Sequence, residues 1–312
     1  MNLPIMVQEK INKLFASFNK TSLVDGREKL TLKYKTNQAI NKSVFDSKQD
    51  SAVYAISRMP ATFAVIFSLL DNLWNQGKLE KISTVADIGS GTGAGFFVCK
   101  EFFEDIDVSL YERDKNMIDV FDEFETGQNV IKFDFLTDEI DKKADLVMCS
   151  YVFSELNDAG RELAVKKMLS CSNRYVLIVD TGTPRTYENF MRLKGKIKEM
   201  GYKISAPCES EKCGLKNDYC QFYARVERST LMKLSKNAEL SYEDEKYFYL
   251  LIDKQLKSDD LQESRVIRRP ILKTNFVELK LCTKDGVKTE NVTKKDKQAY
   301  QKAKKIKINQ IF

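Results

Sequence analysis

The stretch Thr84-Val-Ala-Asp-Ile-Gly89-Ser-Gly91-Thr-Gly93 joins a short apolar strand to a loop rich in glycine, and a helical stretch, Phe96–Phe103, follows. Glycine tolerates positive φ and lets a backbone approach a ligand closely. A strand, a glycine loop and a helix in this order form the first ligand-binding turn of many open α/β sheets. The stretch therefore predicts a ligand site at the edge of such a sheet.

Downstream of this turn, short apolar segments alternate with helical ones. Further strands are expected at Val108–Glu112, Asn129–Phe133, Ala144–Ser150 and Tyr175–Asp180. Helical segments separate them, most clearly Asp158–Ser170 and Glu188–Met200. This alternation is typical of a doubly wound, mostly parallel sheet, so we expect an α/β protein with a Rossmann-like fold.

Regions of different character flank this core. Residues 1–80 carry apolar residues at helical spacing, notably over Met6–Phe18 and Ser51–Trp74, and are expected to form an N-terminal helical region. Residues 81–230 are the expected core, and residues 231–312 a C-terminal extension.

The late part of the chain is expected to close the sheet. Candidate strands Tyr202–Ser205 and Gln221–Val226 fit a hairpin at the sheet edge, with the loop 208–220 as its elaborated tip. We expect residues 231–260 to be helical, and residues 266–292 to contain the short strands of a small β-containing extension.

Two details of the glycine loop favour S-adenosylmethionine (SAM) over NAD. The spacing is GxGxG, with Ala94 where the last glycine of a dinucleotide motif would fall. Asp87 precedes the loop, where a carboxylate suits a cationic amino group and is an awkward neighbour for a pyrophosphate. Glu112 ends the next strand, where its carboxylate can accept both ribose hydroxyl protons.

Three more residues complete the candidate cofactor site. Asp134 follows the third strand, where it suits either the adenine amino group or a turn or helix-capping role. Ser150 and Tyr151 end the fourth strand, where ligands bind in open α/β sheets. The candidate cofactor-binding residues are Asp87, Gly89, Gly91, Gly93, Glu112, Asp134, Ser150 and Tyr151.

Cysteines form a second candidate site. Cys208, Cys213 and Cys220 fall within thirteen residues, Cys282 lies far downstream, and the chain has no histidine. Four thiolates complete either a tetrahedral zinc site or a [4Fe–4S] cluster. The spacing is not the paired CxxC of a zinc ribbon and favours the cluster, with zinc as the alternative metal. Four unrelated buried thiols are the other interpretation.

Composition limits the class of protein. The 312 residues are 43% hydrophobic, yet no apolar run reaches the length of a membrane-spanning helix, so no membrane partner is expected. Met1–Lys20 lacks the apolar segment of a secretion signal, and the seven cysteines read as thiols in a reducing compartment. We therefore expect a cytoplasmic protein, and a monomer.

Positive charge gathers near the C-terminus. The net charge is +6, and Asp296 is the one acidic residue among the lysines of this segment. They are Lys294, Lys295, Lys297, Lys302, Lys304, Lys305 and Lys307. Such a run is typical of a solvated terminal helix, and it also suits contacts with nucleic-acid phosphates.

Several motifs, in the same order along the chain, resemble the Rsm22 family from about residue 54 to the C-terminus. They are YAISRMPAT (Tyr54–Thr62), the DIGSGTG loop, SYVFSEL (Ser150–Leu156), DTGTP (Asp180–Pro184), APCESEKCG, DYCQF, RVERS (Arg225–Ser229) and YEDEKY (Tyr242–Tyr247). The resemblance implies a class I SAM-dependent methyltransferase fold and a [4Fe–4S] cluster held by Cys208, Cys213, Cys220 and Cys282. It also implies that the small ribosomal subunit and its 16S-type rRNA are partners.

The chain departs from the family pattern at three places. Ser210 replaces a histidine after the first cluster cysteine, Gly214 replaces a proline after the second, and Asp180-Thr181 replaces a Glu-Pro pair. None of these changes removes a thiolate, so the cluster remains expected.

No residue is assigned a catalytic role. Cys149 follows an apolar run and reads as a core thiol, while Glu155 and Asp180 are candidate bases that also suit structural roles. Three functions are considered: an rRNA methyltransferase of the small subunit, a non-catalytic assembly or RNA-binding factor, and a small-molecule methyltransferase. The basic C-terminus disfavours the third.

Overall fold

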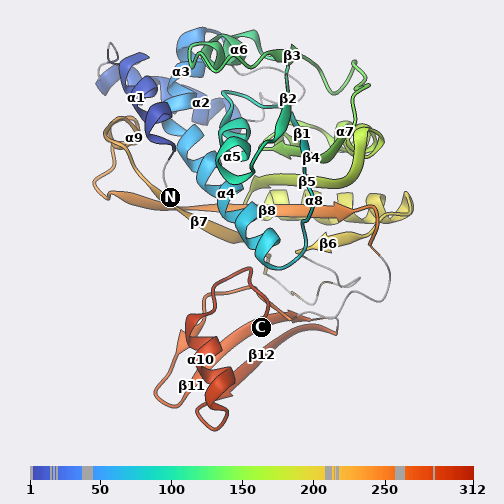
Figure 1. Ribbon diagram of the computed structural model, residues 1–312. Coiled ribbons are helices and arrows are strands. Elements are labelled where there is room, and N and C mark those ends of the chain that lie inside the picture. The colour runs from blue at the N-terminus through green and yellow to red at the C-terminus, as the bar shows by residue number, and fades with distance from the viewer. Residues whose placement is uncertain are drawn as a thin grey trace.

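An eight-stranded sheet lies at the centre of the part of the chain that the structure, a computed structural model, describes (Figure 1). That part comprises residues 3–14, 16, 18, 20–36, 45–207, 213, 215, 218–256, 264–283 and 285–312. The strand order is β3-β2-β1-β4-β5-β8-β6, and β7 also pairs with β8. These strands are β1 (Thr84–Ile88), β2 (Asp107–Glu112), β3 (Val130–Lys132), β4 (Ala144–Ser150), β5 (Ser172–Thr181), β6 (Ile204–Ala206), β7 (Phe222–Glu227) and β8 (Tyr242–Asp253).

The first five strands confirm the predicted parallel sheet. Strands β1 to β5 run parallel to one another, and β1 and β4 occupy the predicted residues. Val85, Leu146 and Val176 are buried at the centres of their strands. Continuous burial of this kind is expected where helices cover both faces of a sheet.

Helices cover both faces. On one face α4, α5 and α6 pack with α3, and on the other α7 and α8 pack together. The helices are α1 (Ile5–Leu14), α2 (Lys20–Lys35), α3 (Lys48–Ser57), α4 (Met59–Asn75), α5 (Ala94–Phe102), α6 (Lys115–Asp122), α7 (Asp158–Cys171), α8 (Pro184–Glu199), α9 (Thr230–Ser235) and α10 (Lys297–Lys305). The doubly wound arrangement is therefore confirmed.

The predicted helical segment Ser51–Trp74 is divided at Arg58 into α3 and α4. Pro60 lies in the first turn of α4, where its missing N–H is tolerated, whereas within a continuous helix it would break the hydrogen-bond ladder. No single described helix is long and apolar enough to cross a membrane, and only α3 and α4 taken together, across a bend of 49°, reach that length and composition.

The prediction of a helix over residues 231–260 is wrong. Only α9 is helical in the described part of that segment, and β8 occupies most of the rest. The run from Phe248 to Ile252 is apolar and buried throughout. Periodicity does not distinguish such a run from a buried helix, and its pairing partners make it a strand.

The predicted hairpin of two late strands is also wrong. Strands β6 and β7 do not pair with each other, because both pair antiparallel with β8. Phe222 of β7 is opposite Tyr247, and Ile204 of β6 is opposite Ile252. The length of β8 allows it to serve both partners in turn, and β5 pairs with its other edge.

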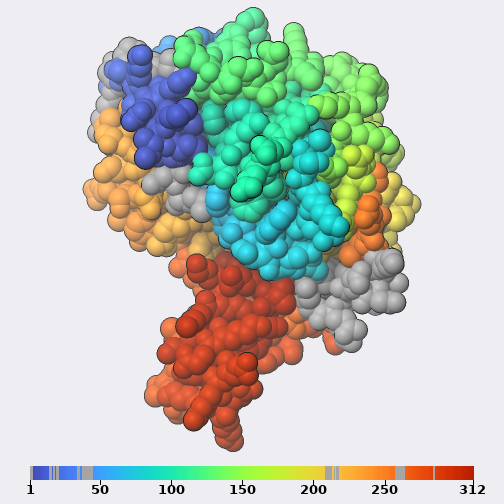
Figure 2. Space-filling model, viewed as in Figure 1, coloured from blue at the N-terminus to red at the C-terminus, as the bar shows by residue number. Residues whose placement is uncertain are grey.

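The described residues from 264 to 312 form a C-terminal lobe that projects from the body of the protein (Figure 2). The predicted short strands are present as β9 (Arg265–Val266), β10 (Ile271–Leu272), β11 (Phe276–Thr283) and β12 (Gly286–Thr293). Helix α10 packs on this sheet around a separate small core, formed by Val266, Val277, Leu279, Leu281, Val292, Ala303 and Ile306. The lysine-rich segment is thus built on a packed helix.

Candidate functional site

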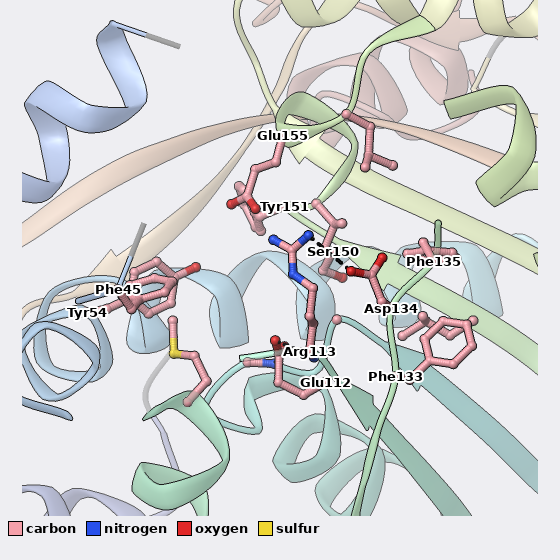
Figure 3. A pocket seen from close by; sticks show the side chains of 16 residues that line it. Phe45, Tyr54, Glu112, Arg113, Phe133, Asp134, Phe135, Ser150, Tyr151 and Glu155 are labelled. Atoms are coloured by element: carbon pink, nitrogen blue, oxygen red, sulfur yellow. Dashed lines mark hydrogen bonds and ion pairs between the residues drawn. The ribbon is translucent and has the colours of Figure 1, made fainter. Parts of the chain in front are cut away.

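A pocket opens at the carboxyl ends of β1, β2 and β4, where open α/β sheets bind ligands (Figure 3). It contains about 710 Å³ of empty space, part of it open to solvent. The predicted cofactor residues that line it are Gly89, Gly91, Glu112, Asp134, Ser150 and Tyr151.

Sequence reasoning missed the aromatic part of the pocket wall. Phe45 and Tyr54 line the pocket from the N-terminal region, and Phe133 and Phe135 line it from the chain after β3. Phe133 and Phe135 flank the predicted Asp134, and Tyr54 opens the YAISRMPAT motif. Those positions were the signals that could have found them, but alternating apolar residues after a strand also suit simple core packing.

Glu112 ties the glycine loop to the end of β2. Its Oε2 accepts a hydrogen bond from Gly91 N, and its Oε1 accepts from Arg113 N and Asp114 N, all at 2.8 Å. Burial raises the pKa of the Glu112 carboxyl, and these backbone donors partly offset that rise. Because Oε1 already has two donors, Oε2 is the atom with a lone pair left for a ribose hydroxyl.

Gly91 gives the loop its shape. Its φ is +54°, a region that favours glycine, and no described atom lies within 4 Å of the place where a Cβ would stand. The loop therefore leaves room on its pocket side for a ligand to lie against the backbone.

Asp134 has the predicted turn role and also lines the pocket, while its contact with an adenine amino group stays a prediction. Its Oδ1 accepts from Leu136 N at 2.8 Å, which is the turn role, and the residue also lines the pocket. A dashed line in Figure 3 joins the guanidinium of Arg113 to Asp134, with Nη1 3.5 Å from Asp134 Oδ2. Sequence reasoning did not single out Arg113, and an adenine amino group would have to share or replace this ion pair.

The end of β4 supplies two buried hydroxyl groups to the pocket. Ser150 Oγ and Tyr151 OH have no hydrogen-bond partner among the described residues. Buried polar groups almost always have a partner, so both hydroxyls indicate a ligand or ordered water. Tyr151 has φ +61°, and the Arg58 guanidinium lies 5.6 Å from its ring centre. Arg58 is held in turn by Glu245 of β8, through two hydrogen bonds of 2.8 and 3.2 Å.

Asp87 and Gly93 are not among the pocket-lining residues. Asp87 is buried against α5, and burial, with a smaller contribution from the Glu112 charge, raises its pKa to about 7. Gly93 has φ +87°, and a Cβ there would meet the Phe121 ring at 2.3 Å. Gly93 therefore serves the close packing of α5 and α6, and direct contact of either residue with a cofactor stays a prediction.

Two of the candidate catalytic groups are enclosed in the sheet. Cys149 is fully buried, and burial raises the pKa of its thiol well above the ordinary value. Asp180 is fully buried, and accepts from Ser154 N at 2.7 Å and Thr181 N at 2.6 Å. Burial raises the pKa of Asp180, and these donors partly offset that rise. Glu155, by contrast, lines the pocket.

A smaller cavity brings three of the four predicted metal ligands together. Cys213, Cys220 and Cys282 line it, while Cys208 lies outside the described residues. Tyr187 OH and Cys213 Sγ share a hydrogen bond of 2.9 Å. Within the described ranges no group of three His, Cys, Asp or Glu side chains has the arrangement of a metal site. The structural support for a metal centre is therefore that three thiols line the same cavity.

Basic residues near these sites fall into two groups. Three arginines have carboxylate partners: Arg225 and Arg269 pair with Asp244, and Arg268 pairs with Asp218. The seven lysines between positions 294 and 307 are exposed and make no ion pair with any described residue. These seven lysines, unlike the three paired arginines, are therefore open to an anionic partner from outside the chain.

The strand order, with β8 antiparallel between β5 and β6, and the pocket at the ends of β1, β2 and β4 define a Rossmann-like class I SAM-dependent methyltransferase fold. The chain belongs to the Rsm22 family, since the family model described as "Mitochondrial small ribosomal subunit Rsm22" matches residues 48–310. The resemblance of the sequence motifs to that family is confirmed. No curated protein matches the chain.

Three solved structures are similar at low identity. Magnesium protoporphyrin IX methyltransferase from Synechocystis PCC 6803, with bound SAM, is 13% identical over 77% of this chain and 99% of its own, with a TM-score of 0.41. The plantazolicin methyltransferase BpumL is 15% identical over 80% and 100%, with a TM-score of 0.44. TehB from Haemophilus influenzae is 18% identical over 59% and 62%, with a TM-score of 0.39. These likenesses are distant, and the fold assignment rests on the strand order.

Proposed function

We propose that this chain is a SAM-binding, iron–sulfur-containing, methyltransferase-like protein that acts on the small ribosomal subunit, in rRNA methylation, subunit assembly or both. The observation that carries the proposal is the pocket at the ends of β1, β2 and β4. There, the glycine loop, a carboxylate at the end of β2 and two buried hydroxyls without a described partner face one space.

The residues of this pocket fit SAM. The glycine loop leaves its backbone accessible, Glu112 Oε2 can accept a ribose hydroxyl, and Asp134 faces the pocket where an adenine amino group can reach it. Ser150 and Tyr151 supply hydroxyls for the polar groups of the ligand. When bound, SAM supplies a methyl group on a positively charged sulfur.

For the cysteine cavity we propose a [4Fe–4S] cluster, with zinc as the alternative metal. Cys213, Cys220 and Cys282 supply three thiols around one space, and Cys208 would be the fourth ligand. Both centres are completed by four thiolates, the soft ligands that suit them.

The family description and the exposed lysines support a ribosomal partner. The description of the family names the mitochondrial small ribosomal subunit. Lysines without a carboxylate partner are able to neutralise backbone phosphates, which is the main source of affinity in most nucleic-acid complexes. The proposed RNA partner is 16S-type rRNA.

A non-catalytic assembly factor is the second candidate function. Cys149 and Asp180 are buried, and the Asp180 carboxylate is already engaged by backbone donors. A residue that removes a proton from a substrate must come within hydrogen-bond reach of it. The pocket therefore supports cofactor binding more directly than it supports chemistry.

Titration calorimetry with SAM tests the pocket. Gly91→Arg is expected to abolish binding, because the new side chain fills the space beside the loop. Gly195→Arg, at an exposed position of α8 with open space around it, adds the same side chain and is expected to bind like the parent. A parent chain that does not bind SAM would contradict the proposal.

Transfer of a labelled methyl group from SAM to small-subunit rRNA separates the two candidates. Transfer by the parent, lost in Gly91→Arg, indicates a methyltransferase. SAM binding without transfer, combined with a subunit-assembly defect in cells that lack the protein, indicates an assembly factor.

A further inference from the structure

Arg265 and Asn309 join the C-terminal lobe to the body of the protein through a buried polar network. Arg265 Nη1 donates to Gln76 Oε1 and to Asn309 O, both at 2.8 Å. Asn309 O also accepts from Asn72 Nδ2 at 3.0 Å, and Asn309 Oδ1 accepts from Tyr249 OH at 2.9 Å. The network thus connects β9 and the C-terminal segment to α4 and β8.

The charge of Arg265 has no carboxylate partner in the described part of the chain. The residue is 3% exposed, and its Nη2 has no hydrogen-bond partner there. A buried cation is costly unless an anion and a full set of hydrogen bonds compensate it. An anion is therefore expected close to this guanidinium.

Arg265 also neighbours two residues that line the cysteine cavity, Cys282 and Pro207. It is paired with Cys282 across β9 and β11, and paired residues of antiparallel strands place their side chains on the same face. Its Nε donates to Pro207 O at 3.0 Å. Cys282 and Pro207 both line the cavity that Cys213 and Cys220 share. Arg265 thus links the strand that carries Cys282 to the segment that contains Pro207.

We propose that Arg265 is the positioning residue and the countercharge of a thiolate–metal centre at this cavity. The inference rests on the metal centre proposed above. Four thiolates give either centre a net negative charge, which is the anion that the buried guanidinium lacks. Through Pro207 and Asn309, Arg265 also fixes the strand that carries Cys282 against the body.

Metal retention by Arg265→Met tests this role, with Arg269→Met as the matched control. Arg269 is exposed, pairs with Asp244 and lies over the Tyr223 ring. Parent and variants are reconstituted anaerobically with iron and sulfide, or with zinc, and then challenged with a chelator. Arg265→Met is expected to lower metal affinity by about 10–100-fold, as loss of a residue behind the metal ligands commonly does. The control is expected to match the parent.

The reduction potential of the iron-loaded protein distinguishes an electrostatic effect of Arg265 on the metal centre from a purely structural one. Arg265→Met is expected to lower the potential, because the reduced centre carries one more negative charge that a nearby cation stabilises. Arg265→Lys keeps the charge but loses the planar set of donors. The reduction potential of Arg265→Lys is therefore expected to lie closer to the parent value than its metal affinity does.

Parent-like metal affinity and potential in Arg265→Met would overturn this inference and leave the metal centre in place. A parent chain that binds neither iron nor zinc would instead overturn the proposed centre, with SAM binding as the check that the body is folded. Where Arg265→Met does not fold, Arg265→Gln replaces it, since glutamine removes the charge and keeps a side-chain amide that can donate to Pro207 O or Asn309 O. Parent-like metal affinity and potential in that variant would equally overturn the inference.

Discussion

The close contact between Asp87 and α5 requires a glycine at position 95, beside the glycine loop. A Cβ on Gly95 would lie 2.2 Å from Asp87 Oδ2 and 2.4 Å from Met148 Cε, so only glycine allows the helix to pass so close to β1. Glycine within a helix ordinarily destabilises a protein by about 0.5–1 kcal/mol relative to alanine. Here close packing reverses that preference.

Gly95→Ala is expected to lower the free energy of unfolding by about 1–3 kcal/mol, because the new methyl group must displace buried neighbours. Gly195→Ala is the control, since Gly195 is also helical and has open space around it. The control is expected to raise the free energy of unfolding by about 0.5–1 kcal/mol. Urea unfolding measures both, and changes of the same sign would contradict the packing argument.

Asp87→Asn is expected to remove a pH dependence of stability. In the fold the pKa of Asp87 is about 7, above its ordinary value of 3.8. Between these values the folded protein keeps a proton that the unfolded chain has released, so the stability of the parent falls as pH rises through this window and levels off above it. Urea unfolding from about pH 5 to pH 8 compares the two proteins. Parallel curves would show that Asp87 does not titrate in this way.

Among the elements, α10 packs its apolar side on the core of the lobe and exposes its lysines. Ala303 and Ile306 face the small core of the lobe, and Asp296 caps the helix by accepting from Ala299 N at 2.9 Å. The lysines of the segment point to solvent. Removing the whole segment would also remove Asn309 and its network, so charge substitution is the sharper test of RNA binding.

The variant that combines Lys294→Gln, Lys297→Gln and Lys305→Gln is expected to weaken binding to small-subunit rRNA. The slope of log affinity against log salt should fall by about 0.7–0.9 for each phosphate that the protein no longer neutralises. The control changes Lys115, Lys142 and Lys166 to Gln, since these lysines already pair with carboxylates. Filter binding at several salt concentrations measures both, and equal slopes would show that this face is not used.

At the scale of the whole molecule, the cysteine cavity is assembled from two parts of the structure. Cys213 and Cys220 come from the chain between β6 and β7, and Cys282 comes from β11 of the C-terminal lobe. A metal bound there would cross-link lobe and body. Metal binding of this kind contributes to folding free energy, because the unfolded chain has no preformed site.

Cys282→Ser is therefore expected to lose bound metal and to lower the melting temperature. Anaerobically purified parent protein should contain about four iron atoms per chain, as a [4Fe–4S] centre requires. Cys171→Ala, at a buried position on α7 away from the cavity, should keep its iron. Iron analysis and thermal unfolding measure both effects, and stoichiometric zinc without iron would favour the alternative metal.

The local signals in the sequence were sufficient for the strand, turn and helix around Gly91 and for β4, because apolar runs and glycine spacing depend on neighbouring residues. The same signals identified six residues that line the pocket. They led to the wrong prediction of a helix for the segment that contains Phe248, since an apolar run fits a buried strand and a buried helix equally well.

The sequence by itself thus determined the parallel core, the family and the position of the ligand-binding turn. Only the tertiary structure decided that β8 enters the sheet beside β5, that Arg58 meets Glu245 and that Cys282 shares a cavity with Cys220. Each of these contacts joins residues far apart in the chain. Such contacts depend on which buried surfaces and unpaired strand edges meet once the chain is compact, and no local pattern of residues encodes that choice.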